Sequence, residues 1–337
     1  MLKLQTTIRA LCAGAILATA AADAAYAESQ QAWLELVLPD SNGQFAGTGG
    51  MNSSNTITGY YSKTDGSWAG FVRTADGTVT TFVPDGGASG TVTTSINAGG
   101  TVVGYINGGA QGFERTPDGQ ITNLGNGVIP TSINDRGVIA GSAYINNRYR
   151  GFVLTPDGNM DSFLSPDGST NDVVGINNKG VVAGYYGDGS YAIPYIRSRY
   201  GKVTTFTIPT ATRIFPVGIN KDNDIAGWWL NGNARHGFLR HADGTIVTFD
   251  EPDAVSGGTM VSAINNDGVI VGTYTGSTTS HGYARSPSGA FVTLTEPKAV
   301  RGTHIDHVAP DGKMTGLYID LGNNEHLVRA NEALTGF

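Results

Sequence analysis

One pattern returns along almost the whole chain, and it limits the folds that are open to this sequence. A Ser/Gly-Ile-Asn step leads into Gly-x-Val-x-Gly-x-Tyr, then into Gly-Phe-x-Arg, and then into an Asp-Gly turn before Phe-x-x-Pro. The step recurs about every 37 to 45 residues, and Val308-Ala309 stands in a seventh place. The asparagines of the step are Asn52, Asn97, Asn134, Asn177, Asn220 and Asn265.

Each repeat is predicted to form four short strands, which we name A to D. The stretches alternate with period two and end in Gly or Asp-Gly, which are hairpin signals. Repeats of this length with four strands are typical of β-propellers and not of helical solenoids. We therefore predict an all-β protein, a seven-bladed β-propeller of four-stranded antiparallel blades over residues 28–337.

The two ends of the chain are expected to meet in the last blade. No strand of the Thr80 to Pro84 type follows Arg329, but residues 33–39 have that form before the first repeat. An N-terminal strand that completes the last blade leaves no open sheet edge, and an open edge would promote aggregation. We predict that the ring closes in this way.

Turn chemistry divides the loops between two rims. The A to B turns, such as 177–180, and the C to D turns, such as Asp243-Gly244, are rich in Asn, Asp and Gly. They share one rim, the bottom. The B to C and D to A loops share the top rim and vary in sequence, which makes the top rim the place to look for function.

The first 27 residues read as a targeting signal and not as structure. Lys3 and Arg9 precede an apolar stretch, and Ala25-Tyr26-Ala27 offers a cleavage site before Glu28. The apolar stretch is too short for a membrane span. We expect a secreted or periplasmic protein that is monomeric.

Composition excludes several classes of protein. The only cysteine, Cys12, lies inside the signal, so the mature chain has neither thiolate catalysis nor cysteine-bound zinc. The net charge is -7 and no basic stripe is present, which argues against nucleic-acid binding. The 49 glycines in 337 residues are about twice the usual ~7%, as frequent turns require.

The run 264–274, followed by His281-Gly282-Tyr283-Ala284-Arg285, resembles the repeat of bacterial extracellular HAF-repeat proteins. The family takes its name from a His-Ala-Phe step, whose middle Ala is replaced by Gly in most repeats of this chain. The resemblance extends over nearly all of the mature chain. It implies an extracellular repeat protein and no particular reaction.

Two residue types recur in every blade or nearly every blade and are interpreted as structural. Arg follows the strand C aromatic residue by two places, and Gly stands inside strand B. An active site seldom needs six symmetric copies of one arginine. We expect these arginines to pair with turn groups and the glycines to allow close approach between blades.

Histidines break the symmetry in the last blades. His236, His281 and His326 begin strand C, while His304 and His307 lie on strand A of blade 7, where the sister residues of His307 are small. Imidazoles suit acid-base chemistry. We predict a catalytic group of His281, His304, His307, His326 and Tyr274 at the top of blades 6 and 7. A divalent metal on these histidines is an alternative, although no tight ligand spacing supports it.

Aromatic residues at the ends of the B strands suggest a surface that binds a ligand. Tyr61, Tyr186, Trp229 and Tyr318 are the predicted stacking residues, with Arg301 beside them. Packing inside the blades is the alternative for one member of each aromatic pair. Two functions follow: binding of an extracellular carbohydrate or small molecule on the top rim, or a lyase or hydrolase that uses histidine and tyrosine as acid and base.

Overall fold

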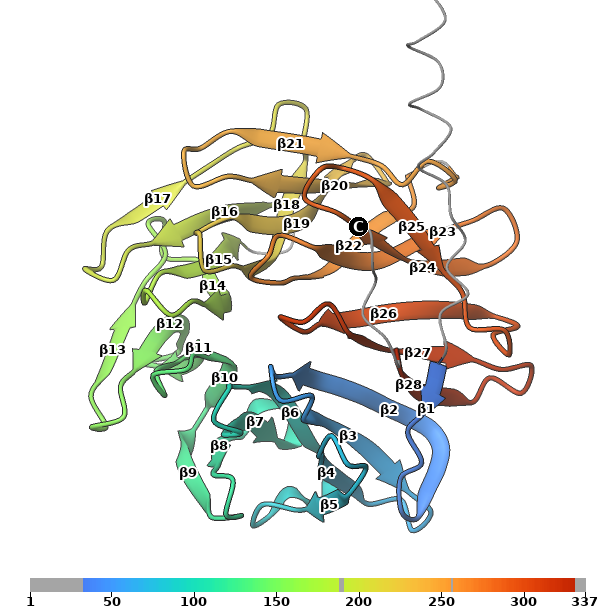
Figure 1. Ribbon diagram of the computed structural model, residues 1–337. Helices are drawn as coiled ribbons and strands as arrows, with labels where there is room; N and C mark the ends of the chain where they lie inside the picture. The colour runs from blue at the N-terminus through green and yellow to red at the C-terminus, as the bar shows by residue number, and fades with distance from the viewer. Residues whose placement is uncertain (1–32, 188–190, 256, 331–337) are drawn as a thin grey trace, which may run out of the picture.

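The computed structural model describes residues 33–187, 191–255 and 257–330, and confirms the all-β propeller (Figure 1). The predicted targeting segment 1–27 lies outside the described residues. Two 3-10 helices, η1 (Gly87–Ser89) and η2 (Asn107–Gly109), accompany the strands. No helix among the described residues is long and apolar enough to cross a membrane.

Five four-stranded sheets and one eight-stranded sheet follow one another around the ring. The eight-stranded sheet is two four-stranded units joined by a single parallel pairing, Ser280 with Gly302. We number the units as blades 1 to 7, each with strands A to D in chain order.

Blade 1 contains β2 (Ser41–Met51), β3 (Ile57–Lys63), β4 (Trp68–Arg73) and β5 (Val79–Phe82), and blade 2 contains β6 (Thr91–Ile96), β7 (Val102–Ile106), β8 (Gln111–Arg115) and β9 (Ile121–Asn126). Blade 3 contains β10 (Val128–Ile133), β11 (Ile139–Ile145), β12 (Arg148–Leu154) and β13 (Met160–Phe163). Blade 4 contains β14 (Thr170–Ile176), β15 (Val182–Gly187), β16 (Ala192–Arg197) and β17 (Val203–Thr205). Blade 5 contains β18 (Arg213–Ile219), β19 (Ile225–Asn231), β20 (Ala234–Arg240) and β21 (Ile246–Phe249). Blade 6 contains β22 (Thr259–Ile264), β23 (Ile270–Thr275), β24 (Ser280–Arg285) and β25 (Phe291–Leu294). Blade 7 contains β26 (Gly302–Val308), β27 (Met314–Ile319) and β28 (Glu325–Ala330), and its fourth strand is the N-terminal β1 (Trp33–Glu35).

The ring closes as the sequence predicts. Strand β1 pairs antiparallel with β28, with Leu34 opposite Arg329, and the Leu36 amide donates to the Leu327 carbonyl at 2.8 Å. Figure 1 shows the blue β1 beside the red β28. Leu36 and Leu38 are buried against Tyr61 and other residues of blade 1, so the closing segment also joins blade 7 to blade 1.

The repeated asparagine ties neighbouring blades together at the bottom rim. The Asn134 side-chain oxygen accepts hydrogen bonds from the amides of Arg136 and Val138, and its amide group donates to the Asn177 carbonyl of the next blade at 3.0 Å. The same link to the next blade runs from Asn52, Asn97, Asn177 and Asn265, the last of which donates to the Ala309 carbonyl. Asn220 donates to Asp224 instead.

The glycine inside strand B corrects one expectation. A Cβ on Gly59 would lie 2.3 Å from the Gly47 carbonyl oxygen and 2.5 Å from the Phe71 ring, and both of those residues belong to the same blade. The close approach is therefore within a blade, between strand A and the strand C aromatic ring, and not between blades. The other six strand B glycines are equally crowded, at 1.9 to 2.4 Å from a strand A carbonyl or neighbouring atom.

The repeated arginine of strand C has the structural role that its symmetry predicts. Arg285 donates to the carbonyl of Ser286 in the following turn, and its guanidinium lies over the Phe249 ring of the preceding blade at 4.6 Å from the centroid. Arg115 does the same with Thr116 and with Phe82. A cation over an aromatic face is stabilising, so these arginines help to hold each blade against the one before it.

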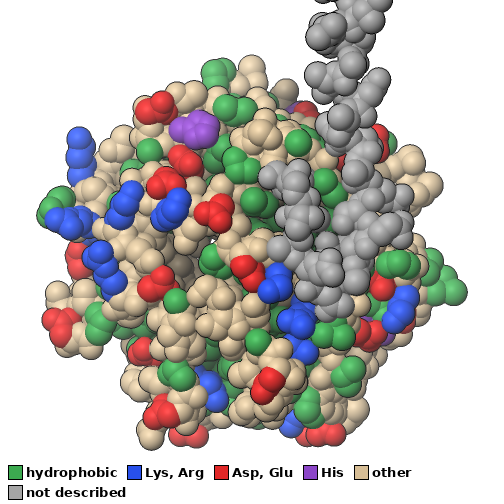
Figure 2. All heavy atoms as spheres, in the orientation of Figure 1, with side chains coloured by type: hydrophobic (Ala, Val, Ile, Leu, Met, Phe, Trp, Pro, Cys, Tyr) green, Lys and Arg blue, Asp and Glu red, His purple; other side chains and the backbone are tan. Residues whose placement is uncertain are grey.

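The surface has few charged side chains. On the face in Figure 2, charged residues are scattered among uncharged atoms, and Lys and Arg gather on the left of the view. That side corresponds to the green and yellow blades of Figure 1. Because the chain has a net charge of -7, this grouping is local.

Candidate functional site

The inner strand of blade 7 differs from its six sisters. Consecutive A strands pack against one another around the ring, and β26 also packs against β2. Each A strand pairs with its B strand through a register shift, which in β26 falls between Ile305 and His307. This bulge places Asp306 outside the regular pairing.

Strand A of blade 7 has histidines at positions 304 and 307, and no other described blade has a histidine at either equivalent position. Cross-strand pairing aligns His304 with Gly47, Val92, Ile129, Asp172, Phe215 and Met260 in the other blades. It aligns His307 with Gly50, Ser95, Ser132, Gly175, Gly218 and Ala263. His304, Asp306 and His307 are all half-buried.

Thr48 of blade 1 connects two of these three residues across the blade boundary. The Thr48 hydroxyl donates to Asp306 Oδ2 at 3.2 Å, and His307 Nε2 lies 3.0 Å from the Thr48 carbonyl oxygen. Burial raises the pKa of the Asp306 carboxyl, against the opposing effects of His307, Thr48 and His304. His304 interacts electrostatically with Asp306 and has no hydrogen bond to a residue that the structure describes.

Tyr60 approaches this group from blade 1. A Cβ on Gly47 would lie 2.7 Å from Cζ and Oη of Tyr60, so the tyrosine ring lies over strand A only because residue 47 is a glycine. Burial, followed by Tyr105, Asp306 and Glu325, raises the pKa of Tyr60. The Tyr60 hydroxyl therefore stays protonated and can donate a hydrogen bond.

An aromatic platform extends from Tyr60 to the surface. Trp68 stacks on Tyr60 at 6.0 Å between centroids and on Phe45 at 6.1 Å. Phe45 is 56% exposed and forms the outer end of the stack, whereas Trp68 and Tyr60 are half-buried. Exposed stacked rings of this kind suit a sugar ring or another flat ligand.

A second aromatic cluster lies on blades 4 and 5. Phe215 stacks on Trp228 at 4.4 Å and meets Tyr185 edge-on at 5.3 Å. Burial and then Asp172 raise the pKa of Tyr185 to about 12. Burial also raises the pKa of Asp172, the one carboxylate that shares the strand A position of His304.

The predicted stacking residues occupy the opposite face of their strands. Tyr61, Tyr186, Trp229 and Tyr318 are between 0% and 8% exposed, as is Tyr274 of the predicted catalytic group, so these side chains pack inside the ring. The prediction chose the wrong member of each pair. Their neighbours Tyr60, Tyr185 and Trp228 are half-buried and lie on the other face.

His281 and His326 are built into their own blades. His281 stacks on Tyr274 and lies 3.2 Å from the Thr295 hydroxyl. His326 stacks on Tyr318, and its Nδ1 lies 2.8 Å from Glu35 Oε1. His236 stacks on Trp229 in the same way, so the structure gives these histidines a packing role and leaves His304 and His307 as the axial pair.

Arg301 lies on the top rim, as predicted, but it belongs to a different feature. It is exposed and lines a shallow hollow of about 620 Å³ with Val255, Val300 and residues 275–280. Arg301 forms no ion pair with a described residue. Among the residues that the structure describes, no group of three or more His, Cys, Asp or Glu side chains is placed to hold a metal ion.

Sequence reasoning missed Phe45 and Glu325, and it left Tyr60 and Trp68 out of the predicted stacking residues. Glu325 Oε2 accepts a hydrogen bond from the Ala46 amide at 3.2 Å, which links blade 7 to blade 1. The grouping of these residues depends on ring closure, because blades 1 and 7 lie at opposite ends of the chain.

Comparison with known proteins supports the fold and no activity. No family model matches the chain, and no curated protein matches its sequence. The chain is similar in structure to a catalytically inactive histidine-to-alanine variant of virginiamycin B lyase from Staphylococcus aureus with quinupristin, at a TM-score of 0.63 and 17% identity, over 89% of this chain and 99% of that one. It is also similar to the β-propeller domain of the Trilobed protease from Pyrococcus furiosus, at 0.59 and 9%, over 85% and 93%. These similarities place the chain in the class of β-propeller proteins.

Proposed function

We propose that this protein is an extracytoplasmic β-propeller that binds a carbohydrate or another small molecule at the top of blades 7 and 1. The observation that carries the proposal is the stacked platform of exposed Phe45 and half-buried Trp68 and Tyr60 beside the polar group of His304 and Asp306. Aromatic faces stack on sugar rings, and neighbouring carboxylates and imidazoles hydrogen-bond their hydroxyls.

A screen of mono- and oligosaccharides by isothermal titration calorimetry tests this proposal. We expect a bound sugar to lose a few-fold to about tenfold in affinity when Trp68→Ala removes the central ring, since a stacked aromatic contact is worth about 0.5–1.5 kcal/mol. Tyr200→Ala is the matched control, because Tyr200 is 81% exposed in a bottom turn of blade 4. A sugar that binds Trp68→Ala as tightly as the wild type, or that loses its affinity in Tyr200→Ala, would contradict the proposal.

A second candidate function, lyase or hydrolase, is favoured by the chemistry of the same residues. A carboxyl whose pKa is raised can donate a proton, and an imidazole close to it can accept one. Asp306 and His304 fit these roles, with Tyr60 as a further hydrogen-bond donor. The structural similarity to virginiamycin B lyase agrees with this alternative at the level of the fold only.

A further inference from the structure

In every blade the last buried residue of strand B lies opposite a residue of strand C, and we call the position of this pair the slot of the blade. The seven cross-strand pairs are Tyr61 and Ala69, Ile106 and Gln111, Ala143 and Arg150, Tyr186 and Ile193, Trp229 and His236, Tyr274 and His281, and Tyr318 and His326. In the last three blades an imidazole stacks on the aromatic ring, with centroids 4.6, 5.3 and 4.5 Å apart.

In two blades the stacked imidazole also contacts a carboxylate. His236 Nδ1 lies 2.8 Å from Asp250 Oδ1, and His326 Nδ1 lies 2.8 Å from Glu35 Oε1. In these two blades a flat nitrogen ring therefore lies between an aromatic face and a carboxylate. The protein supplies that ring itself in blades 5 and 7.

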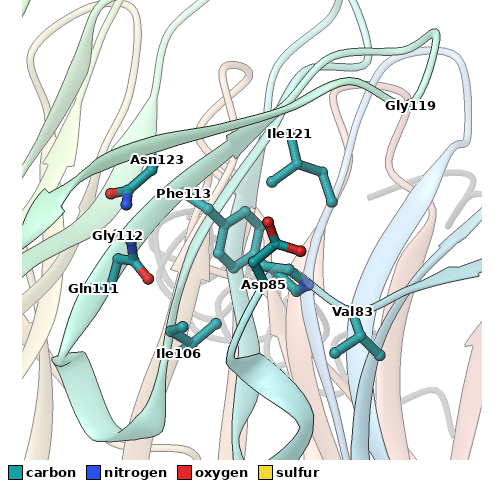
Figure 3. A pocket seen from close by; sticks show the side chains of 10 residues that line it. Val83, Asp85, Ile106, Gln111, Gly112, Phe113, Gly119, Ile121 and Asn123 are labelled. Atoms are coloured by element: carbon teal, nitrogen blue, oxygen red, sulfur yellow. The ribbon is translucent and has the colours of Figure 1, made fainter.

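Blade 2 lacks the filling ring. Its pair is Ile106 and Gln111, neither of which is aromatic, and a cavity of about 360 Å³ remains between blades 1 and 2. The volume lies near the lower end of the range for small-molecule sites. Figure 3 shows the Phe113 ring at the centre of this cavity, with Ile106, Ile121 and Val83 around it.

The carboxylate of Asp85 lines the cavity. Asp85 follows the strand D proline of blade 1 and forms no hydrogen bond or ion pair with a described residue. Its counterpart after the proline of blade 3, Asp167, accepts hydrogen bonds from Tyr191 and from Ser169. Asp85 therefore lines an open cavity, whereas the carboxylate of Asp167 already accepts hydrogen bonds from its neighbours.

We propose that the slot between blades 1 and 2 is a binding site for a small flat ring that carries a protonated nitrogen. Phe113 and Ile106 provide the apolar surface for the ring, and Asp85 pairs with the nitrogen. The Gln111 and Asn123 side chains at the edge of the cavity offer amide groups to further substituents. This site is independent of the platform on blades 7 and 1, because Ile106, Phe113 and Asp85 do not belong to it.

Imidazole is the probe, and pyrazole, a ring of the same size that is uncharged at pH 6, is its control. Titrations of the whole protein at pH 6, followed by NMR, are expected to give millimolar binding of imidazole and at least about tenfold weaker binding of pyrazole, as loss of a charge-assisted hydrogen bond implies. Asp85→Asn should weaken imidazole binding by about tenfold. Asp253→Asn, at the corresponding place after the proline of blade 5, should leave it unchanged.

A variant in which side chains fill the slot of blade 2 provides a second test. Ile106→Tyr with Gln111→His rebuilds the stack that blade 6 contains, so this variant should no longer bind imidazole and should melt at a higher temperature. If the double variant does not fold, Asp85→Asn still decides the question. Absence of imidazole binding to the wild type, or binding that Asp85→Asn does not weaken, would overturn the proposal.

Discussion

At the scale of single residues, alternation along a strand decides which side chains meet a ligand. The sequence indicates that one member of each B strand pair is buried, but the aromatic pairs alone do not say which. A comparison of the equivalent positions in the seven B strands gives the answer. The second residue of the pair is always apolar or aromatic, as in Ile106 and Ala143, whereas the first residue is polar in some blades, as in Ser142 and Thr273. The second position, which is apolar or aromatic in every blade, is the one that is buried in the structure.

The two kinds of histidine predict opposite results on mutation. If the acid-base alternative holds, His304→Ala should lower turnover by roughly 10²- to 10⁴-fold, with little effect on melting, since His304 has no hydrogen bond to a described residue. His281→Ala should spare turnover and cost about 1–2 kcal/mol of stability, because the stack on Tyr274 and the contact with Thr295 are lost.

Both variants are measured on whichever chromogenic ester or glycoside the wild type cleaves, together with a thermal melt. The alternative would be wrong if His304→Ala kept wild-type turnover. It would also be wrong if His281→Ala removed turnover without loss of stability, because the chemistry would then lie in blade 6.

At the scale of strands and turns, the repeated asparagine joins neighbouring blades through hydrogen bonds. Its side chain closes its own turn and reaches the carbonyl of the next turn, so one residue serves two blades. In blade 7, Ala309 replaces the asparagine and has no side-chain amide. Its backbone carbonyl still accepts the hydrogen bond from Asn265 of the preceding blade. This explains why an Ala can stand at the end of the series.

Asn134→Ala should therefore destabilise the ring markedly. It removes three hydrogen bonds at a side chain that is 4% exposed, each worth about 0.5–1.5 kcal/mol, so we expect a loss of about 2–4 kcal/mol in the free energy of unfolding. Asn178→Ala is the control, because Asn178 bonds to Asp135 at the exposed surface of the same turns. Equal costs of the two variants in urea denaturation would show that the asparagine chain is not what joins the blades.

At the scale of the whole molecule, the repeat predicted the fold well and the site poorly. Blade number, strand order and the closure by residues 33–39 follow from periodicity, because every blade repeats the same local instructions. The site depends on departures from the repeat, such as Gly47 beneath Tyr60 and the histidines at positions 304 and 307 of strand A. Their meaning appears only when closure brings the first and last blades together.

Closure itself should depend on pH, because ionisable side chains of β1 and β28 meet there. Burial opposes the charge on His326, but hydrogen bonds to Asp320 and Glu35 outweigh it and raise the His326 pKa above 6.5. Burial likewise opposes the charge on Glu35, and His326 outweighs it and lowers the Glu35 pKa below 4.5. The histidine contribution is fully present below pH 6.5 and is lost as the pH rises through its folded pKa. The glutamate contribution is present above pH 4.5 and is lost as the pH falls through its folded pKa.

The tie between Glu35 and His326 should therefore be strongest between pH 4.5 and 6.5. A double-mutant cycle with Glu35→Gln and His326→Gln, measured by urea denaturation, should give a coupling free energy of at most about 1 kcal/mol at pH 5.5, since both side chains are partly exposed. The coupling should fall toward zero at pH 9, where the imidazole is neutral. A coupling as large at pH 9 as at pH 5.5 would mean that packing of His326 on Tyr318, and not charge, holds the closing strand to β28.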